Sequence, residues 1–155
     1  MENTPILSRL ENLTFTQGLE PAHLQRIAEM ATPMQWGVGE MVFREGEVGS
    51  LLYMVEQGRV AIEVTVPGRG QVTILTVGPG EVFGWTSLFY QRPKTAAART
   101  TVPTRALAIN ASLLRELCDS EPRLGYAVTK RLLRVVSERL KATRLQLLDV
   151  FGVGP

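Results

Sequence analysis

Glycine and proline interrupt the chain every few residues between positions 34 and 110, and this spacing limits the possible fold more than any other feature. The segments between them are short and rich in β-branched and aromatic residues, which is typical of strands. Along Val60–Val66 apolar residues occur at every second position, the pattern of a half-buried strand. Many short strands with glycine-rich turns predict an antiparallel β-roll or jelly roll and disfavour a parallel sheet.

The expected strands follow from these interruptions. They cover residues 41–43, 51–55, 60–66, 72–77, 96–101 and 105–109. Pro67, Gly68, Arg69 and Gly70 form a turn-prone sequence between two of these runs, which predicts a hairpin loop.

Helices are expected on both sides of the β-rich segment. Pro21 suits the first turn of a helix that we expect Pro33 to end. Asn110 is the predicted N-cap of a short helix over residues 111–118. A longer helix, capped by Asp119 or Ser120, is predicted over residues 121–148. The resulting plan is one domain, with a helical segment 1–33, a β-roll 34–110 and C-terminal helices 111–149.

Composition excludes several classes of protein. The 155 residues are 45% apolar and 21% charged, as in a folded soluble domain, and no apolar run is long enough for a membrane span. A single cysteine, Cys118, forms no internal disulfide and is typical of the cytoplasm. A single histidine, His23, does not supply a multi-histidine metal site or a histidine-based catalytic group. We therefore do not expect an enzyme, a metal site or a membrane partner.

The long C-terminal helix carries two apolar stripes and a net positive charge. One stripe begins at Leu124, whereas the other consists of Leu133, Val136, Leu140 and Leu147. An amphipathic helix with two such stripes predicts a homodimer seam along the second one, although packing on its own domain is the alternative. Residues 121–149 contain seven basic and three acidic residues, a net charge of +4. We interpret this charge as a solvated face and do not expect nucleic acid as a partner.

Two motifs carry a resemblance to a known family. The first, Gly39–Gly58, has closely spaced glycines, an apolar run and a final glycine. The second runs from Gly80 to Leu88 and, after five intervening residues, from Lys94 to Thr100. Together they resemble the cyclic nucleotide-binding domain family of bacterial Crp/Fnr-type regulators, protein kinase A regulatory subunits and cyclic nucleotide-gated channels. The resemblance extends from Phe15 to about Leu148 and implies the β-roll fold of that family.

The resemblance implies a ligand site in the second motif, which corresponds to the family's phosphate-binding cassette. In the family, amides at the start of a short helix and one arginine hold the cyclic phosphate, while a glutamate accepts a hydrogen bond from the ribose. The matching residues are Gly84, Trp85, Thr86, Ser87, Lys94, Thr95 and Ala96. A residue of the long helix covers the purine in the family, and Ser137 or Arg139 lies at the corresponding distance.

Two polar positions of the cassette depart from the family pattern. Trp85 stands in place of the ribose-binding glutamate, and an indole offers no acceptor for a hydroxyl. Lys94 stands in place of the arginine; it keeps the charge and loses the bidentate fork. Three interpretations remain. The cassette binds cyclic AMP or cyclic GMP through amides and Lys94, or it binds a different small anion, or Trp85 fills the pocket of a ligand-free interaction module.

The expected function is a non-catalytic sensor. Family members that regulate transcription carry a helix-turn-helix after the long helix, and this sequence ends at Pro155 without one. We therefore expect a stand-alone, dimeric domain that passes its signal through the C-terminal helix to a separate effector protein, with no cofactor other than a possible cyclic nucleotide ligand.

Overall fold

The computed structural model describes residues 5–89 and 92–152. The chain divides into two compact units, Met1–Leu117 and Cys118–Pro155. No helix among the described residues is long and apolar enough to cross a membrane.

The first unit begins with short helices. They are α1 (Ile6–Glu11), the 3₁₀ turn η1 (Thr14–Thr16) and α2 (Pro21–Glu29). Pro21 occupies the first turn of α2, as predicted. The prediction that Pro33 ends this helix is wrong: α2 ends at Glu29, and Pro33 lies inside strand β1 (Ala31–Trp36). β1 is an edge strand that pairs with one neighbour, and a proline is tolerated there because no ladder hydrogen bond is lost on its open side.

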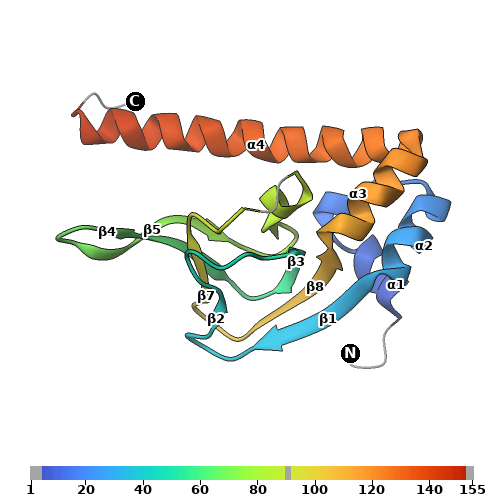
Figure 1. Cartoon of the computed structure of the whole chain (residues 1–155), viewed down its shortest axis with the longest axis horizontal. Helices are drawn as coiled ribbons and strands as arrows, with labels where there is room; N and C mark the ends of the chain where they lie inside the picture. The colour runs from blue at the N-terminus through green and yellow to red at the C-terminus, as the bar shows by residue number, and fades with distance from the viewer. Residues whose placement is uncertain (1–4, 90–91, 153–155) are drawn as a thin grey trace. The chain divides into compact units, whose positions relative to one another are not determined.

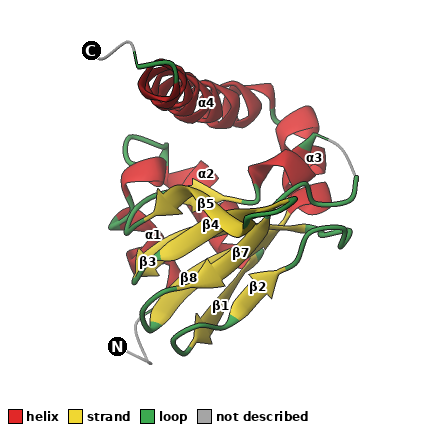
Figure 2. Cartoon of the chain, turned by 90° about the vertical axis from the view of Figure 1, so that its left-hand side faces the viewer, coloured by secondary structure: helices red, strands yellow, loops and turns green. Residues whose placement is uncertain are grey.

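The β-roll consists of two four-stranded antiparallel sheets, seen as two layers in Figure 2. One sheet has the order β1-β8-β3-β6 and the other β2-β7-β4-β5. The remaining strands are β2 (Met41–Phe43), β3 (Leu51–Gln57), β4 (Val60–Val66), β5 (Gly70–Val77), β6 (Val82–Phe83), β7 (Ala97–Thr100) and β8 (Thr104–Asn110). The antiparallel fold class predicted from the spacing of glycine and proline is confirmed. β1 and the two-residue β6 are strands that the periodicity did not predict.

The β4–β5 hairpin closes at the predicted turn. Val66 pairs with Gly70, and the amide of Arg69 donates to the carbonyl of Val66 at 3.0 Å. Gly68 and Gly70 have φ angles of +83° and +77°, which explains the glycines in this loop. In Figure 1 this hairpin projects from the rest of the roll.

An aromatic cluster fills the space between the sheets. Tyr53 on β3 stacks on Phe83 of β6 with ring centroids 4.8 Å apart, and Phe43 lies 6.1 Å from Phe83. Ala98 of β7 is fully buried in the same cluster. The cluster fixes β6, and with it the segment that follows, against the middle of the roll.

The helices that follow the roll start close to where they were predicted. The side chain of Asn110 accepts a hydrogen bond from the Leu113 amide at 3.1 Å, which confirms the N-cap of α3 (Ala111–Ser120). In the second unit, α4 (Pro122–Val150) has Pro122 in its first turn. The prediction that Asp119 or Ser120 caps α4 is wrong, since α3 includes both residues and Glu121 occupies the N-cap position.

Candidate ligand-binding site

The cassette follows directly from the aromatic core. After β6 the chain turns at Gly84, whose φ is +74°, into a 3₁₀ turn, η2 (Trp85–Leu88). A Cβ at Gly84 would lie 3.0 Å from the carbonyl oxygen of Leu51, so glycine is required both for the left-handed φ and for this close approach. The first amides of η2, at Trp85 and Thr86, have no acceptor within the turn, as at the start of any helix.

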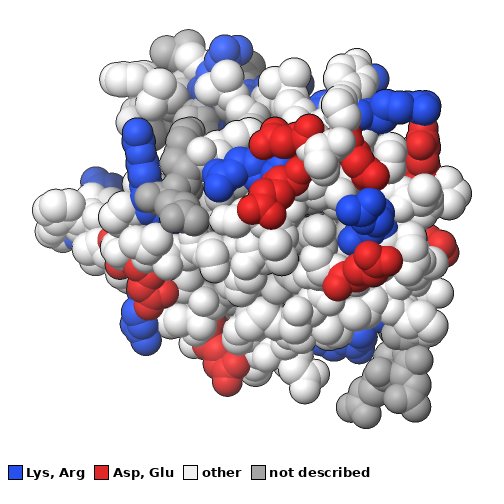
Figure 3. All heavy atoms as spheres, turned by 45° about the vertical axis from the view of Figure 1, so that its right-hand side comes forward, with Lys and Arg blue, Asp and Glu red and all other residues white. Residues whose placement is uncertain are grey.

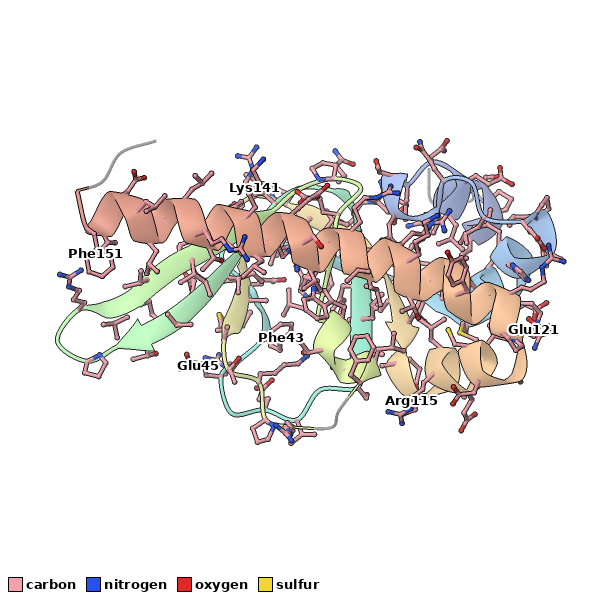
Figure 4. The ribbon with its side chains drawn as sticks, turned by 90° about the horizontal axis from the view of Figure 1, so that it is seen from above. Phe43, Glu45, Arg115, Glu121, Lys141 and Phe151 are labelled. Carbon is pink, nitrogen blue, oxygen red and sulfur yellow. The ribbon has the colours of Figure 1, made fainter. Side chains whose placement is uncertain are left out.

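Lys94 is the buried cation of the cassette. Its side chain is among the buried polar groups, with 9% exposure, and its Nζ donates to Ser87 Oγ at 2.9 Å. Nζ also lies 4.5 Å from the centroid of Phe43, which is labelled in Figure 4. Ser87 Oγ in turn donates to the carbonyl of Gly49 at 3.2 Å. The structure thus brings Ser87 and Lys94, two of the predicted site residues, into direct contact.

Burial lowers the pKa of Lys94 below its usual value of 10.5. No carboxylate within the described residues forms an ion pair with it, because its neighbours are a hydroxyl and an aromatic ring. A buried ammonium without a counter-ion is energetically unfavourable, and an anion at this place would relieve that cost. We define Ser87 and Lys94, with the amides of Trp85 and Thr86, as the anion cradle.

The first glycine motif contacts the cradle, a role that the sequence did not indicate. The amide of Gly46 donates to the carbonyl of Lys94, and the amide of Lys94 donates to the carbonyl of Glu47, both at 2.8 Å. A Cβ at Gly49 would lie 2.7 Å from Lys94 Cε. The glycine at position 49 thus leaves room for the lysine side chain. Its presence in the motif is the one sequence signal for this contact.

Trp85 is half-buried and lies outside the buried core. Its ring meets that of Phe89 edge-on at 6.5 Å, and Phe89 is 47% exposed. Thr86 beside it is exposed. Part of the loop predicted to complete the cassette, residues 90–91, lies outside the described residues.

The end of the cassette leads into β7. Thr95 is exposed and Ala96 half-buried, in a bend that precedes Ala97. Further along β7, Arg99 forms a bidentate ion pair with Glu63 of β4: its Nε donates at 3.1 Å and its Nη2 at 2.5 Å. The alternation of apolar residues along Val60–Val66 would place Glu63 on the solvent side of its strand, whereas Glu63 is buried, with 5% exposure.

The other predicted positions belong to the second unit. Arg139, expected near the purine, is half-buried on α4. Of the predicted dimer residues, Leu133, Leu140 and Leu147 are 65%, 50% and 57% exposed, and Val136 is half-buried. Figure 4 labels Glu121 and Phe151 near the two ends of this helix and Lys141 between them. On the face drawn in Figure 3, basic and acidic side chains are interspersed, without the wide basic area typical of nucleic-acid binding.

Two layers of antiparallel sheet, with a cassette that turns at a glycine and buries a cation, define a β-roll domain with a candidate anion site. The profile of the cyclic nucleotide-binding domain family matches residues 34–121, and the chain belongs to this family, with a domain of the Crp/Fnr type. It is 33% identical over 134 residues to the CRP-like cAMP-activated global transcriptional regulator of Mycobacterium tuberculosis. That match covers 86% of this chain and 58% of the regulator, so the chain spans less than two thirds of that relative.

Solved structures show the same fold. A putative cyclic nucleotide-binding protein from Geobacter metallireducens superposes with a TM-score of 0.76 at 28% identity, over 88% of this chain and 98% of the other. A cyclic nucleotide-binding domain from Methylobacillus flagellatus gives a TM-score of 0.79 at 22% identity, over 94% of this chain and 82% of the other. The expected family and β-roll architecture are therefore confirmed.

Proposed function

We propose that the chain is a non-catalytic regulatory domain that binds a cyclic nucleotide, or a related small anion, in the anion cradle. The observation that carries this proposal is the ammonium of Lys94, which is buried, hydrogen-bonded to Ser87 and without a carboxylate partner among the described residues. A phosphate would supply the missing negative charge. It would also accept hydrogen bonds from the amides of Trp85 and Thr86.

The tryptophan at position 85 changes how the rest of such a ligand is held. Its indole is half-buried, and Thr86 beside it is exposed. An indole accepts no hydrogen bond from a ribose hydroxyl, so affinity depends on the phosphate and on apolar contact with the ring. Loss of one sugar hydrogen bond costs about 1–3 kcal/mol, and we therefore expect weaker binding than a cassette with glutamate would give.

Isothermal titration with cyclic AMP and cyclic GMP tests this function directly. We expect measurable binding to the wild type, at least tenfold weaker binding to Lys94→Met, and retained binding to Lys94→Arg. Arg69→Gln, in the β4–β5 loop, is the matched control for a change in charge, and it should bind as the wild type does. Absence of binding at millimolar nucleotide would overturn the proposal and favour the ligand-free interaction module.

We further propose that α4 transmits the bound state through a homodimer. Leu133, Leu140 and Leu147 recur every seven residues, and Val136, Thr143 and Val150 follow each of them by three, which is the a/d pattern of a two-stranded coiled coil. The leucines are at least half exposed. Thr143 fits an apolar seam because its hydroxyl already donates to the carbonyl of Arg139 at 2.9 Å. An effector protein would then respond to the geometry of the paired helices.

Sedimentation equilibrium tests the dimer. Leu140→Glu places a charge in the middle of the seam and should shift the protein to monomer at micromolar concentration. Lys141→Glu introduces the same side chain at an exposed b position of α4, away from the seam, and should leave the dimer intact. A wild-type protein that sediments as a monomer at all concentrations would contradict this part of the proposal.

A further inference from the structure

Lys94 is the one buried lysine of the chain, and its surroundings favour the uncharged amine. The other two lysines, Lys130 and Lys141, are exposed on α4. Burial lowers the pKa of Lys94, so that at neutral pH a larger fraction of this side chain is free amine than in an ordinary lysine. The free amine is the nucleophilic form, and a desolvated lysine is for this reason an activated nucleophile.

The hydrogen bonds around Lys94 leave the lone pair of its nitrogen available. Nζ donates to Ser87 Oγ at 2.9 Å, and the hydroxyl of Ser87 donates onward to the carbonyl of Gly49 at 3.2 Å. The hydroxyl proton is therefore directed at Gly49 and away from the nitrogen. The ring of Phe43, 4.5 Å from Nζ, offers no polar proton. Neither neighbour donates to the nitrogen, and a free amine at this position keeps its lone pair for attack.

An acyl group on Nζ would remove the unfavourable charge of this position. An amide is neutral, so the cost of burying an ammonium without a carboxylate disappears. The amide keeps one N–H, which still matches Ser87 Oγ as its acceptor. Acylation of an ion-paired lysine would instead leave a carboxylate without its partner. The unpaired state of Lys94 among the described residues therefore favours the acylated product.

We propose that Lys94 is an acylation site that accepts a small acyl group from an acyl phosphate. Nζ attacks the carbonyl carbon of the donor, a C–N bond forms, and the bond from that carbon to the phosphate oxygen breaks. The phosphate leaves with the electron pair of the broken bond and takes the proton that the nitrogen loses. The products are an N-acyl lysine and inorganic phosphate. The acylation goes beyond the proposed function, whereas the choice of a phosphate leaving group rests on it, because the anion cradle would hold that phosphate.

Reaction of the folded protein with acetyl phosphate, followed by peptide mass spectrometry, compares the lysines within one molecule. Each unit by which burial lowers a pKa gives about ten times more free amine at neutral pH, so we expect Lys94 to react about tenfold faster than Lys130 and Lys141. Accessibility alone predicts the opposite order, since the latter two are exposed. In urea-unfolded protein the three rates should become equal. A folded protein in which Lys94 reacts no faster than the exposed lysines would overturn the proposal.

Two substitutions at Ser87 separate the charge around Lys94 from its shape. Ser87→Asp places a carboxylate beside Nζ, which stabilises the ammonium, and should slow acetylation of Lys94 to the rate of the exposed lysines. Ser87→Asn has nearly the size of the aspartate without its charge and should leave Lys94 the fastest of the three. Lys141, labelled in Figure 4, is the internal reference for each variant. Equal slowing in both variants would contradict a role for the unpaired charge.

The choice of donor separates this inference from the proposed function. p-Nitrophenyl acetate carries the same acetyl group without a phosphate, and the preference for Lys94 should be smaller with it. An equal preference with both donors would rule out acyl phosphate as the selected class, and no preference with either would rule out the acylation site itself. Neither result involves a cyclic nucleotide, whose titration against the unmodified protein tests the proposed function separately.

Discussion

The β-roll buries two charges in opposite ways. Glu63 is 5% exposed and is fully engaged, with a bidentate partner in Arg99. Lys94 is 9% exposed and has a hydroxyl and an aromatic face as neighbours, with no carboxylate beside it among the described residues. The first charge is complete without a ligand, whereas the second is unfavourable until an anion arrives.

The difference indicates which part of the roll is structural and which part responds to ligand. A second complete pair, Arg9 with Glu56, has side chains that are 11% and 12% exposed and connects α1 to β3. Paired charges therefore occur where the roll must stay closed. The unpaired ammonium of Lys94 leaves the free domain less stable than the domain with a bound anion, because a ligand that binds only the folded state stabilises that state.

The largest effect is expected when the unpaired charge is removed. Lys94→Met keeps the length of the side chain and should raise the free energy of unfolding of the free protein by about 1 kcal/mol, since an unpaired buried cation is replaced by an apolar group. It should lower anion affinity about tenfold to a hundredfold, the worth of a hydrogen bond to a charged group. Urea unfolding and calorimetry measure the two changes.

The control for this prediction is Lys94→Arg, which keeps the charge and should retain anion binding without the gain in stability. A Lys94→Met protein that unfolds more easily than the wild type would mean that the ammonium already has a stabilising partner. The contrast between the two buried charges would then be incorrect.

A smaller effect is expected when the paired charge loses its partner. Arg99→Met leaves Glu63 with Thr73 alone. Glu63 then becomes a buried charge without an ionic partner, as Lys94 is. Tm should fall by about 2–4 °C, the shift that corresponds to one modest interaction in a chain of this size. Differential scanning calorimetry measures this shift, and Arg69→Met, in the hairpin loop, should leave Tm unchanged. An unchanged Tm in Arg99→Met would show that Glu63 does not depend on the pair.

Much of the fold was predictable because turns and single strands depend on residues that are close together in the sequence. The hairpin at residues 66–70 and the strand Val60–Val66 follow from turn chemistry and spacing. β6 was missed because two residues carry no period, and β1 because Pro33 was interpreted as a helix stop. Proline, which donates no ladder hydrogen bond, is tolerated in an edge strand. Whether a strand lies at the edge depends on the strand order of the whole sheet.

The candidate site was predictable only in part, because many of its contacts join residues that are far apart in the sequence. Gly84, Ser87 and Lys94 followed from a family pattern. The place of Lys94 above Phe43 and beside Gly49 depends on contacts between residues more than 40 positions apart. The pair of Glu63 and Arg99 joins residues 36 positions apart, and strand alternation assigned Glu63 to the solvent side. Burial of that carboxylate depends on neighbours from two other strands, which no local pattern contains.

The smallest effect is a pH dependence, and it has the same sign for the two charges in different pH ranges, because a lowered pKa makes the free energy of unfolding rise with pH in each case. The pKa of Lys94 is lowered from 10.5 by burial, so the folded protein loses this proton before the unfolded chain does. The penalty for the buried ammonium is therefore complete below the folded pKa and disappears as pH rises toward 10.5. The pKa of Glu63 is lowered from 4.5 mainly by its hydrogen bonds with Arg99, so its contribution is present above pH 4.5 and is lost as pH falls through the folded pKa.

Urea unfolding of wild type and Lys94→Met from pH 6 to pH 10 separates these effects. The advantage of Lys94→Met in stability should be constant near neutrality and should shrink as the pH approaches 10, because the wild type then sheds its unfavourable charge. Anion affinity of the wild type should fall over the same interval, since the neutral amine no longer attracts a phosphate. Stability curves that stay parallel up to pH 10 would mean that Lys94 titrates as an exposed lysine does, and that the ammonium is not held in the buried position on which the anion cradle depends.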